Sequence, residues 1–334
     1  METTQMRTRS SSTARATLVL IVAGVLGLAG CSEHDDRDTL ASSGRFGPVT
    51  ISHAFGETTL TDKPTRIVAL GVAATDALLA LAPETLVGAV AGPVTPSGVS
   101  PWQQNLLDTD RVTLLRMDNV GGFDREAILS AEPDLVLAQE AANAEQLYRA
   151  FDGIVPVVAF HESTLGDSWQ TVTRDVARVV GDERGGERLI AAAEQVGADA
   201  PPGAAGKTWM FVASPTVGKV NVLKNPDDPM CRFFDSFRLR LAPRLAGLPD
   251  NAQNPGTVVI SEENYGLLSA DFVIVMAAGD PASTALLDSP IYRRAVGGSV
   301  VWQAEPTVAM ALRSPTMLAT PWVGGRLTEQ LARL

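Results

Sequence analysis

Cys31 has the best-defined chemistry in this sequence, because its surroundings are those of a thiol that receives a lipid. Three arginines lie before residue 16, and residues 16–29 are almost wholly apolar. About 14 apolar residues suit the core of an export signal and are too few for a membrane-spanning helix, which needs about 20. Small residues then lead into Cys31, the pattern at which bacterial lipoproteins are acylated and cleaved. We expect residues 1–30 to be a lipoprotein signal peptide and Cys31 to carry the lipid; an ordinary signal or anchor helix with an incidental cysteine is the alternative.

Groups that could serve an enzyme are few. Cys231 is the one other cysteine, and a lone cysteine is usually a small buried hydrophobic residue. His53 and His161 could act as bases, but each lies beside an apolar strand, where a hydrogen-bonded structural role is the simpler interpretation. The sequence has no nucleophile-elbow, zinc-protease or phosphate-loop motif. We expect no catalytic residue, and a secreted cell-envelope enzyme stays the alternative from another class.

A transition metal held by the protein would need several histidine and carboxylate ligands close together. The sequence has three histidines and no histidine-rich loop. We therefore expect no metal site and no cofactor held by the protein itself. Tyr265 or Tyr292 could ligate haem iron, although each more simply packs inside the protein.

A small anionic ligand would be bound by cations and by flat apolar side chains. Arginine offers delocalised donors to carboxylate, hydroxamate or phenolate oxygens, and tryptophan offers a stacking surface. Ligands of doubly wound sheets bind beyond the carboxyl ends of strands, so segments that follow the expected strands are the candidates. The candidate ligand-binding residues in these segments are Trp102, Arg116, Lys224, Asn225, Arg232, Met310 and Arg313.

These candidates also have structural interpretations. Trp102 could pack on its own lobe, and Arg116 and Arg313 could be solvated or could bridge two lobes. Lys224 could simply neutralise Asp227 and Asp228, which follow it closely.

The elements that would position these residues form two series of apolar strands that alternate with helices. The first series has strands near residues 66–71, 86–90, 133–138 and 155–160, after a small hairpin around Gly56. The second has strands near residues 208–213, 257–260, 272–276 and 299–302, with helices near 230–237, 262–268, 289–295 and 314–331. Wholly apolar strands that alternate with helices predict parallel sheets covered on both faces.

Between the two series, residues 165–198 have a helical pattern whose one weak point is residues 181–186. We therefore predict an α/β fold of two lobes, each a mostly parallel sheet flanked by helices, joined by one long α-helix. The predicted boundaries are a signal peptide at 1–30, a flexible tether at 31–47, an N-terminal lobe at 48–163, a connecting helix at 164–199 and a C-terminal lobe at 200–334.

The charge of the chain excludes one class of partner. The net charge is −11, and it becomes −13 when residues 1–30 are removed. Nucleic-acid binding depends on cationic contacts with phosphate, so we expect no nucleic-acid partner. Membrane contact is expected through the lipid alone, and the mature protein is expected to be a monomer.

Several motifs in this order and spacing carry a resemblance to a known family. They are residues 63–71 (KPTRIVALG), 121–129 (GGFDREAIL), 132–138 (EPDLVLA), 260–263 with 269–274, and 312–315 (LRSP). Over nearly all of residues 49–334 the chain resembles the substrate-binding lipoproteins of ABC importers for ferric siderophores, haem and cobalamin, the class with a single long helix between two lobes. Siderophore-binding lipoproteins of high-GC Gram-positive bacteria are the most similar.

The resemblance implies a receptor anchored outside the cytoplasm, which binds a small iron chelate between its lobes and delivers it to an ABC permease for iron uptake. A haem or cobalamin receptor of the same class is the nearest alternative. In this family a carboxylate on each lobe meets arginines of the permease, and the motifs carry these roles onto Glu126 and Glu263. Helix capping is the structural alternative for both, and Glu262 could take the place of Glu263.

Overall fold

The computed structural model describes residues 46–92, 94–164, 166–276 and 281–334, and these residues form one compact unit, Phe46–Leu334. Cys31, the predicted signal peptide and most of the predicted tether lie outside the described residues. No helix among the described residues reaches the length and apolar content needed to cross a membrane.

The first sheet has five strands in the order β5-β4-β3-β6-β7, and all of its pairs are parallel. Its strands are β3 (Ile67–Ala69), β4 (Leu86–Val90), β5 (Thr113–Leu115), β6 (Leu135–Leu137) and β7 (Val157–Val158). The helices that connect them are α1 (Val72–Leu81), α2 (Arg125–Leu129) and α3 (Ala144–Ala150). The predicted hairpin is formed by β1 (Val49–His53) and β2 (Gly56–Leu60), which pair antiparallel. The first of the two predicted series is therefore confirmed.

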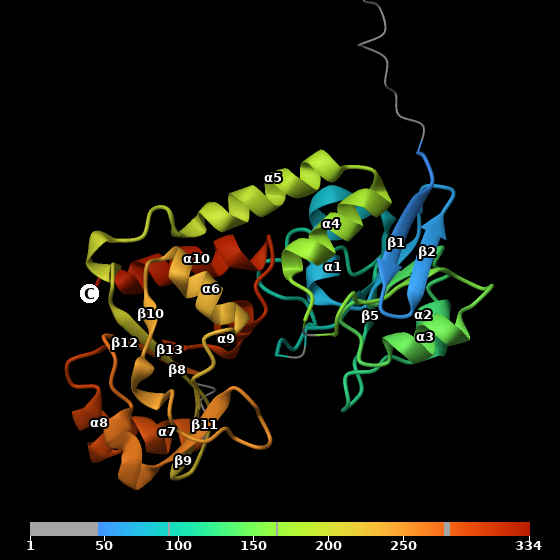
Figure 1. Cartoon of the computed structure of the whole chain (residues 1–334). Helices are drawn as coiled ribbons and strands as arrows, with labels where there is room; N and C mark the ends of the chain where they lie inside the picture. Colours follow the sequence, from blue (N-terminus) through green and yellow to red (C-terminus); the bar gives the residue numbers. More distant parts are fainter. Residues whose placement is uncertain (1–45, 93, 165, 277–280) are drawn as a thin grey trace, which may run out of the picture. The chain divides into compact units, whose positions relative to one another are not determined.

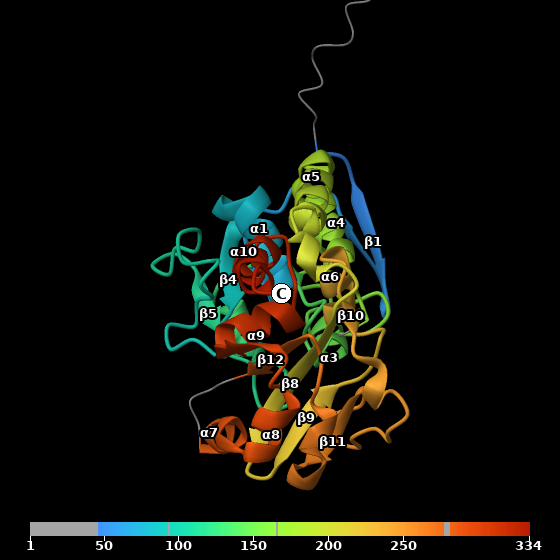
Figure 2. The ribbon, with the colours of Figure 1, turned by 90° about the vertical axis from the view of Figure 1, so that its left-hand side faces the viewer.

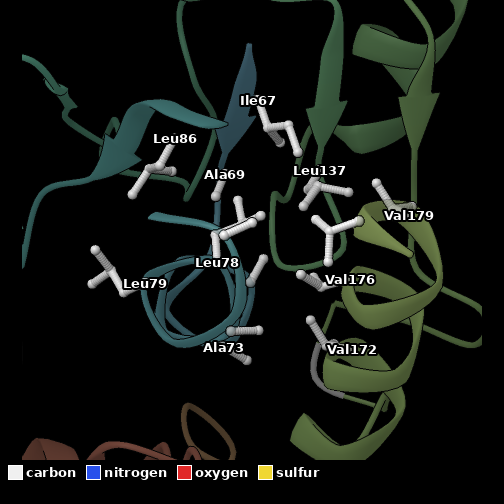
Figure 3. Packing of buried hydrophobic residues seen from close by; sticks show 14 of the residues in the cluster. Ile67, Ala69, Ala73, Leu78, Leu79, Leu86, Leu137, Val172, Val176 and Val179 are labelled. Carbon is white, nitrogen blue, oxygen red and sulfur yellow. The ribbon is translucent and has the colours of Figure 1, made fainter. Parts of the chain in front are cut away.

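One face of this sheet is covered by α1 and by α4 (Trp169–Val180). Leu78 of α1, Leu137 of β6 and Val176 of α4 point toward one another in the core and are wholly buried (Figure 3). The core follows from the apolar strands and from the apolar stripe at i, i+4 and i+7 on α4, which includes Val172, Val176 and Val179.

The second sheet is mixed, with three parallel and two antiparallel pairs among its described strands. Its strands are β8 (Thr208–Thr216), β9 (Lys219–Leu223), β10 (Arg240–Leu241), β11 (Thr257–Ser261), β12 (Phe272–Met276) and β13 (Val300–Ala304). The order is β11-β9-β8-β12-β13, in which β9 pairs antiparallel with both β8 and β11, and β10 pairs with β8. Gly218, with φ of +74°, makes the tight turn from β8 into β9 that an antiparallel pair requires.

Four helices of the second lobe begin with proline, whose missing N–H and fixed φ suit the first helical position. They are α6 (Pro229–Ser236), α7 (Pro281–Asp288), α8 (Pro290–Ala295) and α9 (Pro306–Arg313), and they are followed by α10 (Ala319–Leu331). Met310 and Arg313, which the sequence placed only in a segment after the last strand, therefore lie on a helix. Pro306 is the signal that marks its start.

The connection between the two sheets is two helices, so the prediction of one long helix is wrong. Helix α4 ends at Gly181, which adopts a left-handed φ of +76°, and α5 (Glu183–Glu194) begins after Asp182. The Asp182 carboxylate accepts the backbone N–H of Gly185 at 2.8 Å and so caps the new helix. The apolar pattern continues across the break, but Gly181 and Asp182 supply a helix end and a helix start.

Helix α10 lies below α5 in both views of the ribbon (Figures 1 and 2) and packs against the 3-10 helix η2 (Gln195–Gly197), which follows α5. Gly324 of α10 makes this approach possible, since a Cβ there would lie 2.2 Å from the Cγ2 of Val196, just beyond α5. The two-lobe α/β architecture is confirmed, with a jointed connection and a mixed second sheet.

Candidate ligand-binding cleft

A cavity of about 460 Å³ opens at the carboxyl edge of the first sheet. The first lobe contributes Ala73, at the start of α1 after β3, and Glu140, shortly after β6. Other parts of its wall come from the two connecting helices and from the second lobe, including residues 166–170, 193–194, 232–233, 313–316 and 320. This position agrees with the rule that ligands bind beyond the carboxyl ends of strands in doubly wound sheets. Its volume lies within the usual range of small-molecule sites, about 300–1,000 Å³.

Asp76 of α1 lies behind this cavity and joins the first lobe to the second. It is wholly buried and accepts hydrogen bonds from Trp102 Nε1 at 2.9 Å, from Gln103 Nε2 at 2.5 Å and from the Thr316 hydroxyl. Burial raises the pKa of Asp76 to about 6, and the three hydrogen bonds act against that rise. The Trp102 ring also packs on Trp322 of α10, with ring centroids 5.4 Å apart.

Glu140 is a partly buried acid in the cavity wall. Its Oε2 accepts the backbone N–H of Ala73 at 2.9 Å, at the start of α1. Burial raises the pKa of Glu140 to about 7; hydrogen bonds from the Ala73 and Ala74 backbone lower it, and the charge of Asp76 adds to the rise. Gly71 makes room for this side chain, since a Cβ there would lie 1.9 Å from Glu140 Oε2.

Two arginines of the second lobe line the same cavity. Arg232 lies on α6 and Arg313 ends α9, and both are exposed. Within the described part of the chain, neither guanidinium has a hydrogen-bond or ion-pair partner. Trp169 and Phe233 add aromatic surface to the wall. The cavity thus combines unpaired cationic donors with flat apolar surface.

The other candidate ligand-binding residues lie outside the cavity lining. Trp102 is only 9% exposed, and its indole N–H is bound to Asp76. Met310 is partly buried against the core of the second lobe. Arg116 is exposed after β5 and does not line the cavity. Arg116 thus agrees with its interpretation as a solvated residue, whereas Trp102 packs on the second lobe and not only on its own.

Lys224 and Asn225 belong to the end of the β9–β11 pair. Lys224 Nζ donates to the backbone oxygen of Leu248 at 2.6 Å and forms an ion pair with Asp250 at 2.5 Å. Its partner is therefore Asp250 and not one of the two aspartates that follow it in the sequence. The Asn225 side chain accepts the backbone N–H of Asp227 at 3.1 Å and stabilises the turn before α6.

Sequence reasoning missed Glu140, Trp169 and Thr316. The signal for Glu140 was available, because it stands two residues after the apolar run that ends at Ala138, at the carboxyl end of a predicted strand. Trp169 and Thr316 were hidden by being placed inside expected helices, whereas the structure puts one at a helix start and the other before a helix.

The remaining chemically interesting side chains have structural partners or are buried. His53 hydrogen-bonds Thr58 at 3.1 Å, and His161 hydrogen-bonds Asp175 at 2.7 Å. Burial, with a smaller effect of nearby aspartates, raises the pKa of the Cys231 thiol to about 12. The thiol is therefore a poor nucleophile. Tyr265 and Tyr292 are buried in the second lobe. The described residues contain no group of three or more His, Cys, Asp or Glu side chains that could hold a metal ion.

The two predicted docking glutamates are both exposed. Glu126 lies in the first turn of α2, whose start is capped by Asp124. Glu263 lies in the 3-10 helix η5 (Glu262–Leu267), where the Ser261 hydroxyl donates to it at 2.5 Å and lowers its pKa. Ser261 stands at the start of η5, but its side chain does not cap the backbone. Glu262 instead accepts from the Ser289 hydroxyl at 3.2 Å.

Comparison with known proteins gives this geometry a context. Residues 67–208 match the model of a family described as periplasmic binding protein. No curated protein matches the sequence. A periplasmic solute binding protein from Mycobacterium smegmatis is 26% identical, with a TM-score of 0.71, and the match covers 86% of this chain and 98% of that one.

Two more distant structures share the fold. PiaA of Streptococcus pneumoniae, solved in complex with ferrichrome, is 22% identical, with a TM-score of 0.66 and coverage of 85% of this chain and 98% of that one. A petrobactin-binding protein of Bacillus subtilis is 16% identical, with a TM-score of 0.63 and coverage of 85% and 99%. The resemblance to periplasmic solute-binding proteins is confirmed, and the proteins that the chain resembles are described as binding proteins rather than enzymes. The two more distant structures show the same fold.

Proposed function

We propose, on the premise that this chain is a periplasmic solute-binding protein, that it is a lipid-anchored receptor for a ferric siderophore. It captures the chelate in the cavity between the two sheets and delivers it to an ABC permease for iron uptake. The observation that carries the proposal is the pair of guanidiniums, Arg232 and Arg313, that line the cavity without a partner in the described chain.

These arginines suit the oxygens of an iron chelate. Hydroxamate, catecholate and carboxylate oxygens carry negative charge even when they bind iron, and planar guanidinium groups donate to such oxygens in pairs. Trp169 and Phe233 offer flat surface for the apolar parts of the chelate. Ferrichrome and petrobactin, the ligands of the two more distant solved structures, agree in class with this chemistry.

Haem and cobalamin fit the cavity less well. Its described lining has no His, Cys, Met or Tyr side chain that could ligate a metal from the protein. Tyr265 and Tyr292, the residues considered for haem iron, are buried elsewhere in the second lobe. A ligand whose iron is fully coordinated by its own donors needs no such residue.

The test is fluorescence titration of the purified protein with a panel of ferric siderophores, haem and cobalamin. Trp169 lines the cavity, so a bound chelate that absorbs light should quench its emission, and Trp169→Phe should remove most of that quenching. Arg232→Ala and Arg313→Ala should each weaken binding by roughly 10- to 100-fold, the effect of losing a charged hydrogen bond. Arg294→Ala, an exposed arginine of α8 outside the cavity, is the matched control. Unchanged affinity in both cavity variants would refute the site.

The proposal includes the anchoring and the docking. Cys31 carries the lipid that holds a monomeric receptor at the outer face of the cell membrane, and residues 31–47 form its tether. Glu126 and Glu263 are the docking carboxylates, and their exposure on separate lobes supports this role. Charge pairs of this kind act strongly on the rate and specificity of association.

A further inference from the structure

Charge is divided across the cavity. Three acidic side chains line it: Glu140 after β6 of the first lobe, Asp167 in the loop before α4, and Glu194 at the end of α5. The basic ones, Arg232 and Arg313, both come from the second lobe. No ion pair joins the two sets within the described residues. A ligand in this cavity would meet an acidic wall on one side and a basic wall on the other.

Glu140 differs from the other two acids. The Asp167 carboxylate holds the loop before α4, since it accepts the backbone N–H groups of His161 and Glu162 at 2.7 and 2.9 Å. Glu194 is exposed to solvent and accepts the Gln170 amide at 3.1 Å. Glu140 is partly buried, and its hydrogen-bond partners are neutral backbone N–H groups at the start of α1.

The Glu140 side chain is also held in position. It packs on the bare backbone of Gly71, where a Cβ would lie 2.5 Å from the Glu140 Cδ. Together with the hydrogen bond from the Ala73 N–H, this contact fixes the position of the carboxylate. A buried carboxylate without a cationic partner is costly, because desolvation disfavours its charged form. The protein therefore keeps a fixed acid in the wall of its cavity at a cost to stability.

A second polar group in the cavity wall lacks a partner. The Thr320 hydroxyl of α10 lines the cavity, is on a residue only 4% exposed and makes no hydrogen bond within the described residues. A buried hydroxyl without a partner marks a position where a bound molecule can supply one.

From these observations we infer that Glu140 determines specificity, and that the ligand is an iron chelate with a cationic group, such as a protonated amine. The ligand places that group against Glu140 and its iron-binding oxygens against Arg232 and Arg313. This inference rests on the proposed function and narrows its ligand class. A protonated amine supplies the positive charge that Glu140 lacks, whereas a wholly anionic chelate would be repelled from this wall.

The experiment compares two probes that differ in one charge. Ferrioxamine B carries a free protonated amine, and its N-acetylated form is otherwise the same chelate. The wild-type protein should bind the amine form more tightly than the acetylated form by a factor of about ten or more, as expected for a hydrogen bond between charged groups. Glu140→Gln keeps the shape and the acceptor for the Ala73 N–H, and it should reduce this preference to near equality. Glu57→Gln removes the same charge from exposed strand β2 and is the control.

The pH profile gives a readout that does not depend on a variant. The free amine stays protonated from pH 5.5 to 8.5, while Glu140 loses its proton around pH 7. Affinity for ferrioxamine B should therefore rise with pH through this window, relative to the acetylated form. Asp76 behind the site, whose pKa is raised to about 6, and the cavity groups Asp167, Glu194, Arg232 and Arg313 also act on the charged amine. The same profile measured with Glu140→Gln therefore isolates Glu140: the part of the rise that this variant loses belongs to the Glu140 carboxylate.

The outcomes separate this inference from the proposed function. Equal affinity of the wild type for the two probes, or an undiminished preference in Glu140→Gln, would overturn the role of Glu140. Binding of ferric chelates that are wholly anionic, together with rejection of both probes, would also overturn it. Failure of every ferric chelate to bind would instead refute the proposed function.

Discussion

The Thr316 hydroxyl provides a sharp test of how the two lobes are joined. It is on a residue only 1% exposed and donates to the buried Asp76 carboxylate, which belongs to the other lobe. The same oxygen accepts the backbone N–H of Ala319 at 2.9 Å, at the start of α10. Thr316→Val keeps the size of the side chain and removes both interactions.

The expected loss of stability follows from these two bonds. A hydrogen bond to a charged group contributes about 1.5–3 kcal/mol, and the neutral bond from the Ala319 N–H contributes about 1 kcal/mol more. The free energy of unfolding should therefore fall by about 3 kcal/mol at pH 8. Thr320→Val, one turn further along, is the matched control: its hydroxyl has no partner within the described residues, so its removal should be neutral or slightly stabilising.

The deficit should also depend on pH. The pKa of Asp76 is raised from 3.8 to about 6 in the folded protein, so the folded state keeps a proton that the unfolded chain gives up, and stability falls as pH rises through this window. The bond from Thr316 lowers the pKa of Asp76, and its loss should raise that pKa further. Each unit by which the loss of this bond raises the pKa of Asp76 costs about 1.4 kcal/mol of stability above pH 7 and almost nothing at pH 5.

Urea unfolding of the wild type and both variants at pH 5 and pH 8, followed by circular dichroism, measures these values. The Thr316→Val deficit should be larger at pH 8 than at pH 5, while the Thr320→Val value should stay near zero at both. A deficit that is equal at the two pH values, or that is shared by the two variants, would show that the buried carboxylate does not join the lobes as described.

The other predictions concern the anchor and the permease. Cys31→Ala should release the protein from the membrane fraction or leave the signal peptide attached, as fractionation and the mass of the protein would show; normal cleavage with full membrane retention would contradict the lipid anchor. Glu126→Arg combined with Glu263→Arg should abolish uptake of the iron chelate by cells and leave its affinity in solution unchanged. Normal uptake by the double variant, or lost affinity in solution, would mean that these glutamates have another role.

The sequence predicts most strands of this fold because a strand that is buried on both faces needs an uninterrupted run of apolar residues. The strands at 67–69, 135–137 and 272–276 are buried almost throughout, and their apolar runs stand out. Strand β9 was missed because it alternates: Lys219 and Asn221 interrupt the apolar residues at 220 and 222, as expected for a strand with one face covered less completely. The break at Gly181 was noticed only as a weak point, since an apolar stripe of constant period crosses it.

The cavity was only partly predictable. Arg232 and Arg313 were found because cations after strands are the natural donors for an anionic chelate. Trp102 was placed in the site on the same rule, yet its indole is used by Asp76, a contact between distant segments that no local pattern records. Glu140 was not predicted, because an anionic chelate requires cations and aromatic side chains and gives no reason to expect an acid in the same place.

The order of elements along the chain has a consequence for how the first lobe acquires its structure. All five strands of its sheet are complete by residue 158, but the face that α4 covers needs Val172, Val176 and Val179. A chain that emerges from its amino end therefore shows a bare apolar surface until about twenty more residues have followed. Helix α4 is thus the last piece of the first lobe as much as the start of the connection. An export factor that holds the chain until residue 180 has emerged would shield that surface from aggregation.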